Sequence, residues 1–205
     1  MRLLPVASFV AISSILGTKL AVRFGTKLVV ASGLLLMAGC YLWVTTAAAS
    51  TSYLTIAAQM VVLGTGMGLT SAPATEAIMG VVPKAKAGVG SAVNDATRLL
   101  GGTLGVAVIG SVYASLYASR LTGMLPSGLS AAVARTADAS VGAALTAAGK
   151  LAGIGHPALA AAVHSAASSA FFDGFHTADY VSAGAAAAGA LMALATASPA
   201  DRQRR

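Results

Sequence analysis

Only a few side chains in the apolar parts of this sequence could bind a proton or another ion. Glu76 follows Pro73 by three residues, and Asn94, Asp95 and Arg98 lie together a short distance further along the chain. Ionisable residues are costly at membrane depth, and where they occur they mark proton relays or substrate pathways. Glu76 could therefore be a carboxylate that binds and releases a proton or, at a membrane boundary, a solvated side chain.

Asp95 and Arg98 are three residues apart, so on a helix they share a face and can pair. Asn94 lies four residues before Arg98 and can join them. One interpretation is a structural or gating pair at the cytoplasmic boundary of the membrane. The other is a direct role in carrying protons or substrate. The spacing leaves both interpretations open.

Signals of enzymatic chemistry are missing from the sequence. The single cysteine, Cys40, lies in an apolar run, so neither a disulfide within the chain nor a cysteine-based metal site is expected. There is no phosphate-cradling loop, nucleophile elbow or dinucleotide motif. The histidines His156, His164 and His176 lack metal-ligand spacing. The aspartates Asp138, Asp173 and Asp179 are expected to be solvated. We therefore expect no enzyme, no cofactor and no metal.

The composition places these residues in a membrane protein. Of 205 residues, 57% are hydrophobic and 9% are charged, whereas soluble domains have about 25% charged residues. A net charge of +7 could indicate a nucleic-acid partner. The basic residues, however, form short clusters between apolar runs, as cytoplasmic anchors do. We expect an all-α transmembrane protein and no nucleic-acid partner.

Five segments are apolar and long enough to cross a bilayer, which takes about 20 residues. They are residues 3–20, 28–46, 54–82, 88–118 and 177–197. The chain then divides into a four-helix segment (1–118), an Ala/Ser/Gly-rich outer loop (119–176), and a last span with a basic tail (177–205). Short helices are expected in the loop at 131–151 and 158–170, and a sixth span there is possible. The first segment could also be a signal peptide.

Basic residues occur in alternate connections between the predicted spans. They follow the first, third and fifth segments: Lys19, Arg23, Lys27, Lys84, Lys86, Arg202, Arg204 and Arg205. Because short basic loops stay in the cytoplasm, the C-terminus is expected inside and the N-terminus outside. Most aromatic residues fall at the predicted outer ends of the spans, which agrees with this orientation.

Small residues on the predicted spans would let helices approach closely, as helix pairs in lipid require. Gly64 and Gly68 lie on one span, and Gly101 and Gly105 have the GxxxG spacing of close helix contacts. Pro73 interrupts the third span and could form a kink or a gating hinge. These residues serve either close packing of the helices or the sliding of one helix against another during a transport cycle.

Several motifs are shared with a known family of membrane proteins. One runs from Gly17 through Arg23 and Gly25 to Lys27 and resembles a loop of the G-x-x-x-D-R-x-G-[RK] type, with Val22 where that loop usually has aspartate. Further motifs cover residues 64–69, 72–83, 88–107 and, more loosely, 170–176. Together they resemble the last third of the fourteen-helix drug:proton antiporters of the major facilitator superfamily. The resemblance is specific over residues 3–120 and implies that the five spans match helices ten to fourteen.

The resemblance implies a multidrug efflux transporter of the bacterial plasma membrane that gives antibiotic resistance by exchanging lipophilic or cationic drugs for protons. Its partners would be membrane lipids, protons and small drug-like substrates. Such transporters hold substrate between two halves. The chain would then be a C-terminal portion that is inactive alone, with Met1 as an internal start and the N-terminal half missing. The 17–27 loop and the face of Asn94, Asp95 and Arg98 would act at the inner gate.

A second hypothesis belongs to another class of protein. The chain could be a small membrane protein that transports nothing and packs against a partner membrane protein through its glycine faces.

Overall fold

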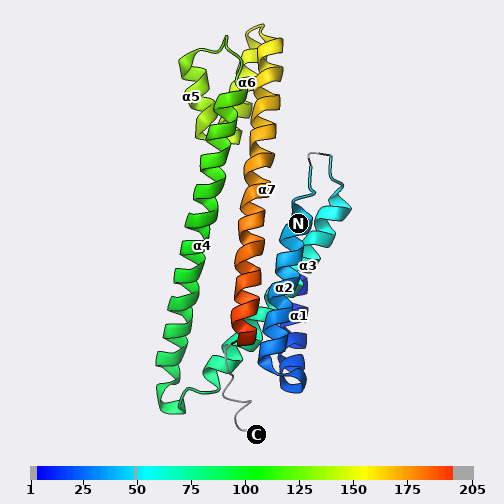
Figure 1. Ribbon diagram of the computed structural model, residues 1–205, viewed down its shortest axis with the longest axis vertical. Coiled ribbons are helices and arrows are strands. Elements are labelled where there is room, and N and C mark those ends of the chain that lie inside the picture. Colours follow the sequence, from blue (N-terminus) through cyan, green and yellow to red (C-terminus); the bar gives the residue numbers. More distant parts are fainter. Residues whose placement is uncertain (1–3, 49, 196–205) are drawn as a thin grey trace. The chain divides into compact units, whose positions relative to one another are not determined.

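The computed structural model describes residues 4–48 and 50–195, and it is helical without strands in this part of the chain (Figure 1). The long helices are α1 (Leu4–Phe24), α2 (Thr26–Val44), α3 (Tyr53–Met79), α4 (Ala87–Met124) and α7 (Pro157–Ala195). Each is long and apolar enough to cross a membrane, which confirms the predicted set of five. The tail arginines Arg202, Arg204 and Arg205 lie outside the described residues, as do the predicted span ends at Leu3 and Ala197.

The lengths of these helices fall into two classes. At a rise of about 1.5 Å per residue, the 19 residues of α2 match a hydrocarbon layer of about 30 Å. The 38 residues of α4 and the 39 of α7 extend for about 57 Å. Both helices are therefore long enough to project well beyond the hydrocarbon layer.

The connection between the first two spans is much shorter than expected. We predicted a loop over residues 17–27, but α1 continues to Phe24 and α2 begins at Thr26. Only Gly25 lies between them, with φ of 91°. This left-handed conformation suits glycine because it has no Cβ, and it turns the chain within one residue.

The segment after α4 also differs from the expected one. The predicted helix over 131–151 is divided into α5 (Ala131–Ala139) and α6 (Val141–Gly153) by Ser140, whose side chain caps α6 by accepting from the Ala143 N–H. The predicted helix over 158–170 is the first part of α7, which continues through the last span. No proline follows Pro157 within α7, so nothing in that stretch blocks a continuous helix.

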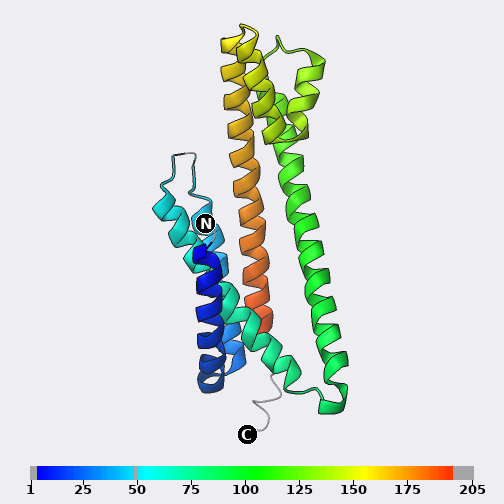
Figure 2. The same cartoon turned by 180° about the vertical axis from the view of Figure 1, so that it is seen from behind.

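The chain forms two compact units. The first contains the chain through Leu104 and the chain from Asp179 onward, and the second comprises Gly105–Ala178. In the first unit α3 packs against both α1 and α2, and these three helices lie side by side from either direction (Figures 1 and 2). The second unit contains α5 and α6, which pack against each other, with the adjoining parts of α4 and α7.

Glycines on α3 allow the close packing of the first unit. A Cβ on Gly68 would lie 2.7 Å from the Val10 carbonyl oxygen of α1, and the Ser13 hydroxyl of α1 donates to the Gly64 carbonyl at 3.3 Å. On the α2 side, a Cβ on Gly66 would lie 2.9 Å from the Gly33 carbonyl oxygen. Alternate glycines of one helix thus bring two neighbours to backbone contact.

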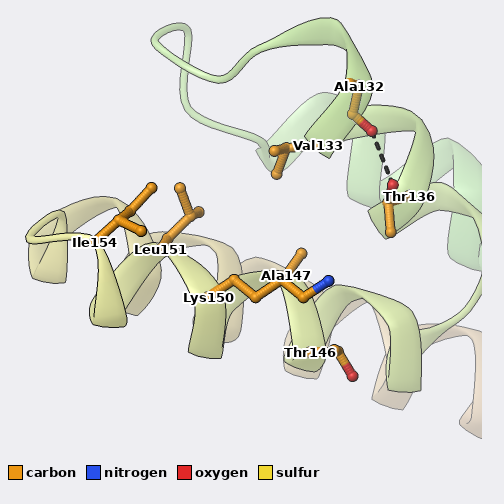
Figure 3. A pocket seen from close by; sticks show the side chains of 8 residues that line it. All are labelled: Ala132, Val133, Thr136, Thr146, Ala147, Lys150, Leu151 and Ile154. Carbon is orange, nitrogen blue, oxygen red and sulfur yellow. Dashed lines mark hydrogen bonds between the residues drawn. The ribbon is translucent and has the colours of Figure 1, made fainter.

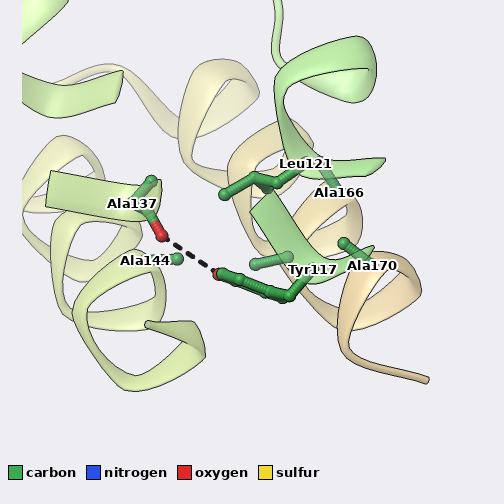
Figure 4. Packing of buried hydrophobic residues seen from close by; sticks show 7 residues of the cluster. Tyr117, Leu121, Ala137, Ala144, Ala166 and Ala170 are labelled. Carbon is green, nitrogen blue, oxygen red and sulfur yellow. Dashed lines mark hydrogen bonds between the residues drawn. The ribbon is translucent and has the colours of Figure 1, made fainter. Parts of the chain in front are cut away.

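An alanine-rich core holds the second unit together. The buried residues around it are Tyr117, Leu121, Ala137, Ala144, Ala166, Ala167 and Ala170 (Figure 4). The phenol of Tyr117 donates to the Ala137 carbonyl at 3.1 Å, which ties α4 to α5. Leu121 is fully buried. The core places aromatic and leucine side chains of α4 between small residues of the other helices.

Candidate functional site

An open cleft lies between α3 and the first part of α4. Its cavity of about 390 Å³ is lined by Thr70, Ser71, Ala74, Thr75, Ile78, Val93, Asn94, Thr97 and Arg98. A second cavity, of about 560 Å³, adjoins it because Ser71, Thr75 and Arg98 line both. The second cavity reaches α1 and is also lined by Val10, Ser14, Met67, Ala72, Glu76 and Met79. We call the two together the α3–α4 cleft.

The cleft brings together three of the four polar residues singled out in the sequence. Arg98 lines both cavities, Asn94 lines the first, and Glu76 lines the second. Asn94 is buried, whereas Glu76 and Arg98 are exposed. Asp95 is exposed and lines neither cavity. Among the described residues no ion pair involves Asp95 or Arg98, so this structure does not use the pairing that their spacing allows.

The threonine hydroxyl groups of the cleft are bonded within their own helices. Thr75 donates to the Ser71 carbonyl at 2.9 Å, and Thr97 donates to the Val93 carbonyl at 2.8 Å. A hydroxyl that donates in this way still has acceptor capacity. The walls therefore offer apolar surface and weak acceptors, with two opposite charges from Glu76 and Arg98. Such a surface suits an amphipathic molecule better than a strongly hydrated one.

Pro73 positions the cleft-lining part of α3. It is buried inside the helix, where proline removes one backbone hydrogen bond. A Cβ on Gly17 of α1 would lie 3.3 Å from the Pro73 Cγ and 3.2 Å from the Leu69 Cα. Gly17 is therefore a packing residue inside α1 in this structure. Of the other residues in its motif, Arg23 lies in the last turn of α1, with its guanidinium 5.6 Å from the Phe24 ring centre.

The two remaining glycines predicted for packing have open surroundings. A Cβ on Gly101 or Gly105 of α4 would meet nothing within 4 Å. Leu99, Leu100 and Leu104 of the same helix are each about two-thirds exposed, at 71%, 65% and 65%. The apolar surface of α4 thus needs lipid or other protein around it, because water is a poor solvent for it.

Asp179 is buried, so our expectation that it is solvated was wrong. It lies on α7 and is 8% exposed. It interacts electrostatically with Cys40 and Tyr41 of α2. The sequence did contain a signal, because helical spacing puts Asp179 on one face with the small residues Ser182, Ala183 and Ala190. The structure buries all four. By contrast Asp173, on the same helix, is 47% exposed and pairs with Arg120 at 3.6 Å.

A further pocket of about 230 Å³ lies between α5 and α6 in the second unit (Figure 3). Its lining is mostly apolar, with Thr136, Thr146 and Lys150 as polar members. Thr136 donates to the Ala132 carbonyl at 2.9 Å, so its hydroxyl is bonded locally. Nothing in this pocket corresponds to a residue that the sequence analysis selected.

The chain is similar in sequence to several bacterial multidrug transport and resistance proteins. No protein-family model matches the chain. It is 33% identical over 121 residues to the multidrug transporter protein MdtP of Bacillus subtilis. The aligned region is 59% of this chain and 22% of that protein. It is 33% identical over 115 residues to the multidrug resistance protein Stp of Mycobacterium tuberculosis, and the aligned region is 56% of this chain and 21% of Stp. The multidrug efflux pump LfrA of Mycolicibacterium smegmatis is 29% identical over 148 residues. That region is 72% of this chain and 29% of LfrA.

The chain thus spans between a fifth and a third of the length of these relatives. Its five long apolar helices make it a multi-pass membrane protein. The resemblance to bacterial drug efflux proteins that we noted in the motifs is confirmed, since the relatives include a multidrug transporter, a multidrug resistance protein and a multidrug efflux pump.

Proposed function

We propose that the chain is the C-terminal part of a proton-coupled multidrug efflux transporter and that the α3–α4 cleft forms one wall of its drug pathway. The observation that carries the proposal is the gathering of Glu76, Asn94 and Arg98 around one cleft with otherwise apolar walls. The names of the relatives support drug-like substrates.

The charges of the cleft suggest how protons and drug exchange. Glu76 and Arg98 line the same cavity, so an ionised Glu76 would offset the repulsion that Arg98 exerts on a lipophilic cation. A proton on Glu76 would leave that repulsion without compensation. Proton binding and cation binding would therefore oppose each other, which is the requirement for antiport.

We place the cleft near the cytoplasmic face of the membrane. Glu76 lies three residues before the end of α3, and the basic residues Lys84 and Lys86 follow in a short helical turn. Because basic connections stay in the cytoplasm, this end of α3 would face inward, and the C-terminus would also be cytoplasmic. Asn94, Asp95 and Arg98, near the start of α4, would then act at the inner gate.

One wall alone cannot form a pathway that opens in turn to the two sides of the membrane. Transporters of this kind rock two helix bundles around a central site, and the described chain has five helices that could span. We propose that the chain alone does not transport and that further helices of the transporter cover α4.

The test uses ethidium efflux from a drug-sensitive bacterial strain. One culture makes the 205-residue chain, and another makes a chimera in which this chain replaces the matching segment of Bacillus subtilis MdtP. We expect efflux from the chimera only, and we expect it to collapse when the proton gradient is dissipated. Efflux by the chain alone would refute its dependence on further helices.

Two tryptophan variants of the chimera test the cleft itself. Ala74→Trp fills the cleft, because Ala74 lines it, and should reduce efflux at least about tenfold. Ala77→Trp is the matched control, since Ala77 is exposed and lines neither cavity. Equal efflux by both variants, at equal amounts in the membrane, would remove the cleft from the drug pathway. If the chimera does not reach the membrane, binding of ethidium to the purified chain in lipid nanodiscs replaces efflux as the readout.

A further inference from the structure

The α3–α4 cleft contains a buried amide group whose hydrogen bonds are not used within the described chain. Asn94 lines the first cavity and is 9% exposed. Its side chain has no hydrogen-bond partner among the described residues. Its amide nitrogen and oxygen are not among the described side-chain atoms that are sealed from solvent without a partner. The amide group of Asn94 therefore opens into the cavity, where a ligand can reach it.

Two further side chains of the cleft have unused hydrogen-bonding groups. Ser71 and Arg98 each line both cavities, and in the described part of the chain neither the hydroxyl group nor the guanidinium is bonded. The threonine hydroxyl groups around them, by contrast, donate to carbonyls of their own helices. Asn94 lies four residues before Arg98 on α4, so both are on one face of that helix. Together they offer the cleft several N–H donors and a positive charge.

Glu76 supplies the opposite charge from α3. It lines the second cavity together with Arg98, and no ion pair joins the two among the described residues. A ligand that is only a cation is attracted by Glu76 and repelled by Arg98. A ligand that carries both a positive and a negative group is attracted by both side chains. The charges of the cleft therefore favour a zwitterion over a simple cation.

We propose that the cleft binds amphipathic zwitterions in preference to simple cations, with the N–H groups of Asn94 and Arg98 on the carboxylate of the ligand and Glu76 beside its cationic group. The apolar part of such a ligand lies against Ala74 and Ile78, which line the same cavity as Asn94. This inference rests on the function proposed above and adds the class of substrate.

The pairing of a carboxylate with Arg98 gives both affinity and orientation. A guanidinium and a carboxylate can form two parallel hydrogen bonds, and hydrogen bonds between charged groups are stronger than those between neutral ones. An apolar ligand group that displaced water from Asn94 without replacing its hydrogen bonds would leave a buried amide unsatisfied. Sites built to hydrogen-bond one ligand group discriminate against analogues that lack it.

The experiment compares two fluorescent ligands that differ at one group. Tetramethylrhodamine carries a delocalised positive charge and a carboxylate at neutral pH, whereas its methyl ester has the same rings and only the positive charge. Binding to the purified chain in lipid nanodiscs is followed by fluorescence polarisation, and the signal of empty nanodiscs is subtracted to correct for partition into lipid. We expect the zwitterion to bind at least about tenfold more tightly than its ester.

Substitutions in the cleft locate this preference. Arg98→Gln and Asn94→Ala should weaken binding of the zwitterion, Arg98→Gln by at least about tenfold, and neither should weaken binding of the ester. Ala74→Trp fills the cleft and should abolish binding of both dyes. The matched controls are Lys86→Gln, which removes a positive charge, and Ser91→Ala on α4, because both residues are exposed and line neither cavity.

The outcomes separate this inference from the proposed function. An ester that binds as tightly as the zwitterion, or a preference that survives Arg98→Gln, would overturn the inference and leave the cleft as a drug site. Binding of neither dye, or binding unchanged by Ala74→Trp, would overturn the inference and the proposed role of the cleft together. The comparison of the two dyes needs only the wild-type chain, so a variant that does not fold leaves the test intact.

Discussion

Gly33 on α2 and Gly66 on α3 lie so close that a methyl group on either would stand 2.9 Å from the carbonyl oxygen of the other. Backbone atoms cannot move aside as side chains do, so this contact fixes the distance between the two helices. In lipid, where helices pair by close packing, such a contact is a main source of stability for the first unit.

Substitution of Gly66 by alanine should therefore separate α2 from α3. We expect Gly66→Ala to lower the free energy of unfolding by about 1–3 kcal/mol, the usual cost of overpacking. Unfolding can be followed with a thiol-reactive dye in detergent, since Cys40 is the only cysteine and is 2% exposed. Gly39→Ala on α2 is the control, because a Cβ there meets nothing within 4 Å. Equal losses in both variants would show that the contact is unimportant.

The hydrogen bond from Tyr117 to the Ala137 carbonyl should stabilise the second unit. Tyr117→Phe removes the donor and leaves a carbonyl unsatisfied, at a cost of about 1 kcal/mol. Faster hydrogen exchange of the α5 amides would report this loss. Tyr113→Phe is the matched control, because its ring stacks on Tyr117 and the described structure shows no bond to its hydroxyl group. Exchange in α5 that is unchanged by Tyr117→Phe would argue against the bond.

The ion pair between Arg120 and Asp173 should contribute little. The side chains are 59% and 47% exposed, and exposed pairs typically contribute less than about 1 kcal/mol. We expect Arg120→Gln to lower the unfolding temperature of the chain by no more than about 4 °C, and by less at high salt, because salt screens exposed charges. A larger loss that does not depend on salt would mean that the pair is shielded from solvent.

Much of the architecture could be predicted from the sequence, because composition and loop charge act over whole segments. Five spans follow from runs of apolar residues, and Glu76, Asn94 and Arg98 were noticed as polar residues within such runs. That they line one cleft depends on how α4 packs beside α3, which the sequence does not reveal.

The errors have physical reasons as well. Gly25 alone makes the α1–α2 turn. The sequence did not reveal this, because residues 18–24 can form either helix or loop and basic residues are compatible with both. Asp179 is buried because its neighbours on one face of α7 are small, and a charge at the start of a predicted span is ordinarily solvated. The length of α7 was missed because alanine-rich segments are strongly helical even where they are too polar to span.

The open glycines of α4 provide a prediction that concerns assembly. Gly105→Leu should leave the stability of the chain unchanged or slightly raised, because a side chain there meets nothing within 4 Å and glycine is a poor helix former. In the MdtP chimera the same change should reduce efflux if further helices pack on this face. Val106→Leu, next to it and 75% exposed, is the control. Efflux that survives Gly105→Leu would place lipid, rather than protein, against Gly105.

The central claim, that the α3–α4 cleft binds drug, is tested most directly by photolabelling. A photoreactive lipophilic cation is bound to the purified chain in lipid nanodiscs and crosslinked by light, and the labelled peptides are identified by mass spectrometry. We expect the label to gather on residues 70–79 and 93–98 and unlabelled ethidium to displace it. Label spread evenly over the lipid-facing helices, with no displacement by ethidium, would show that the cleft does not bind drug.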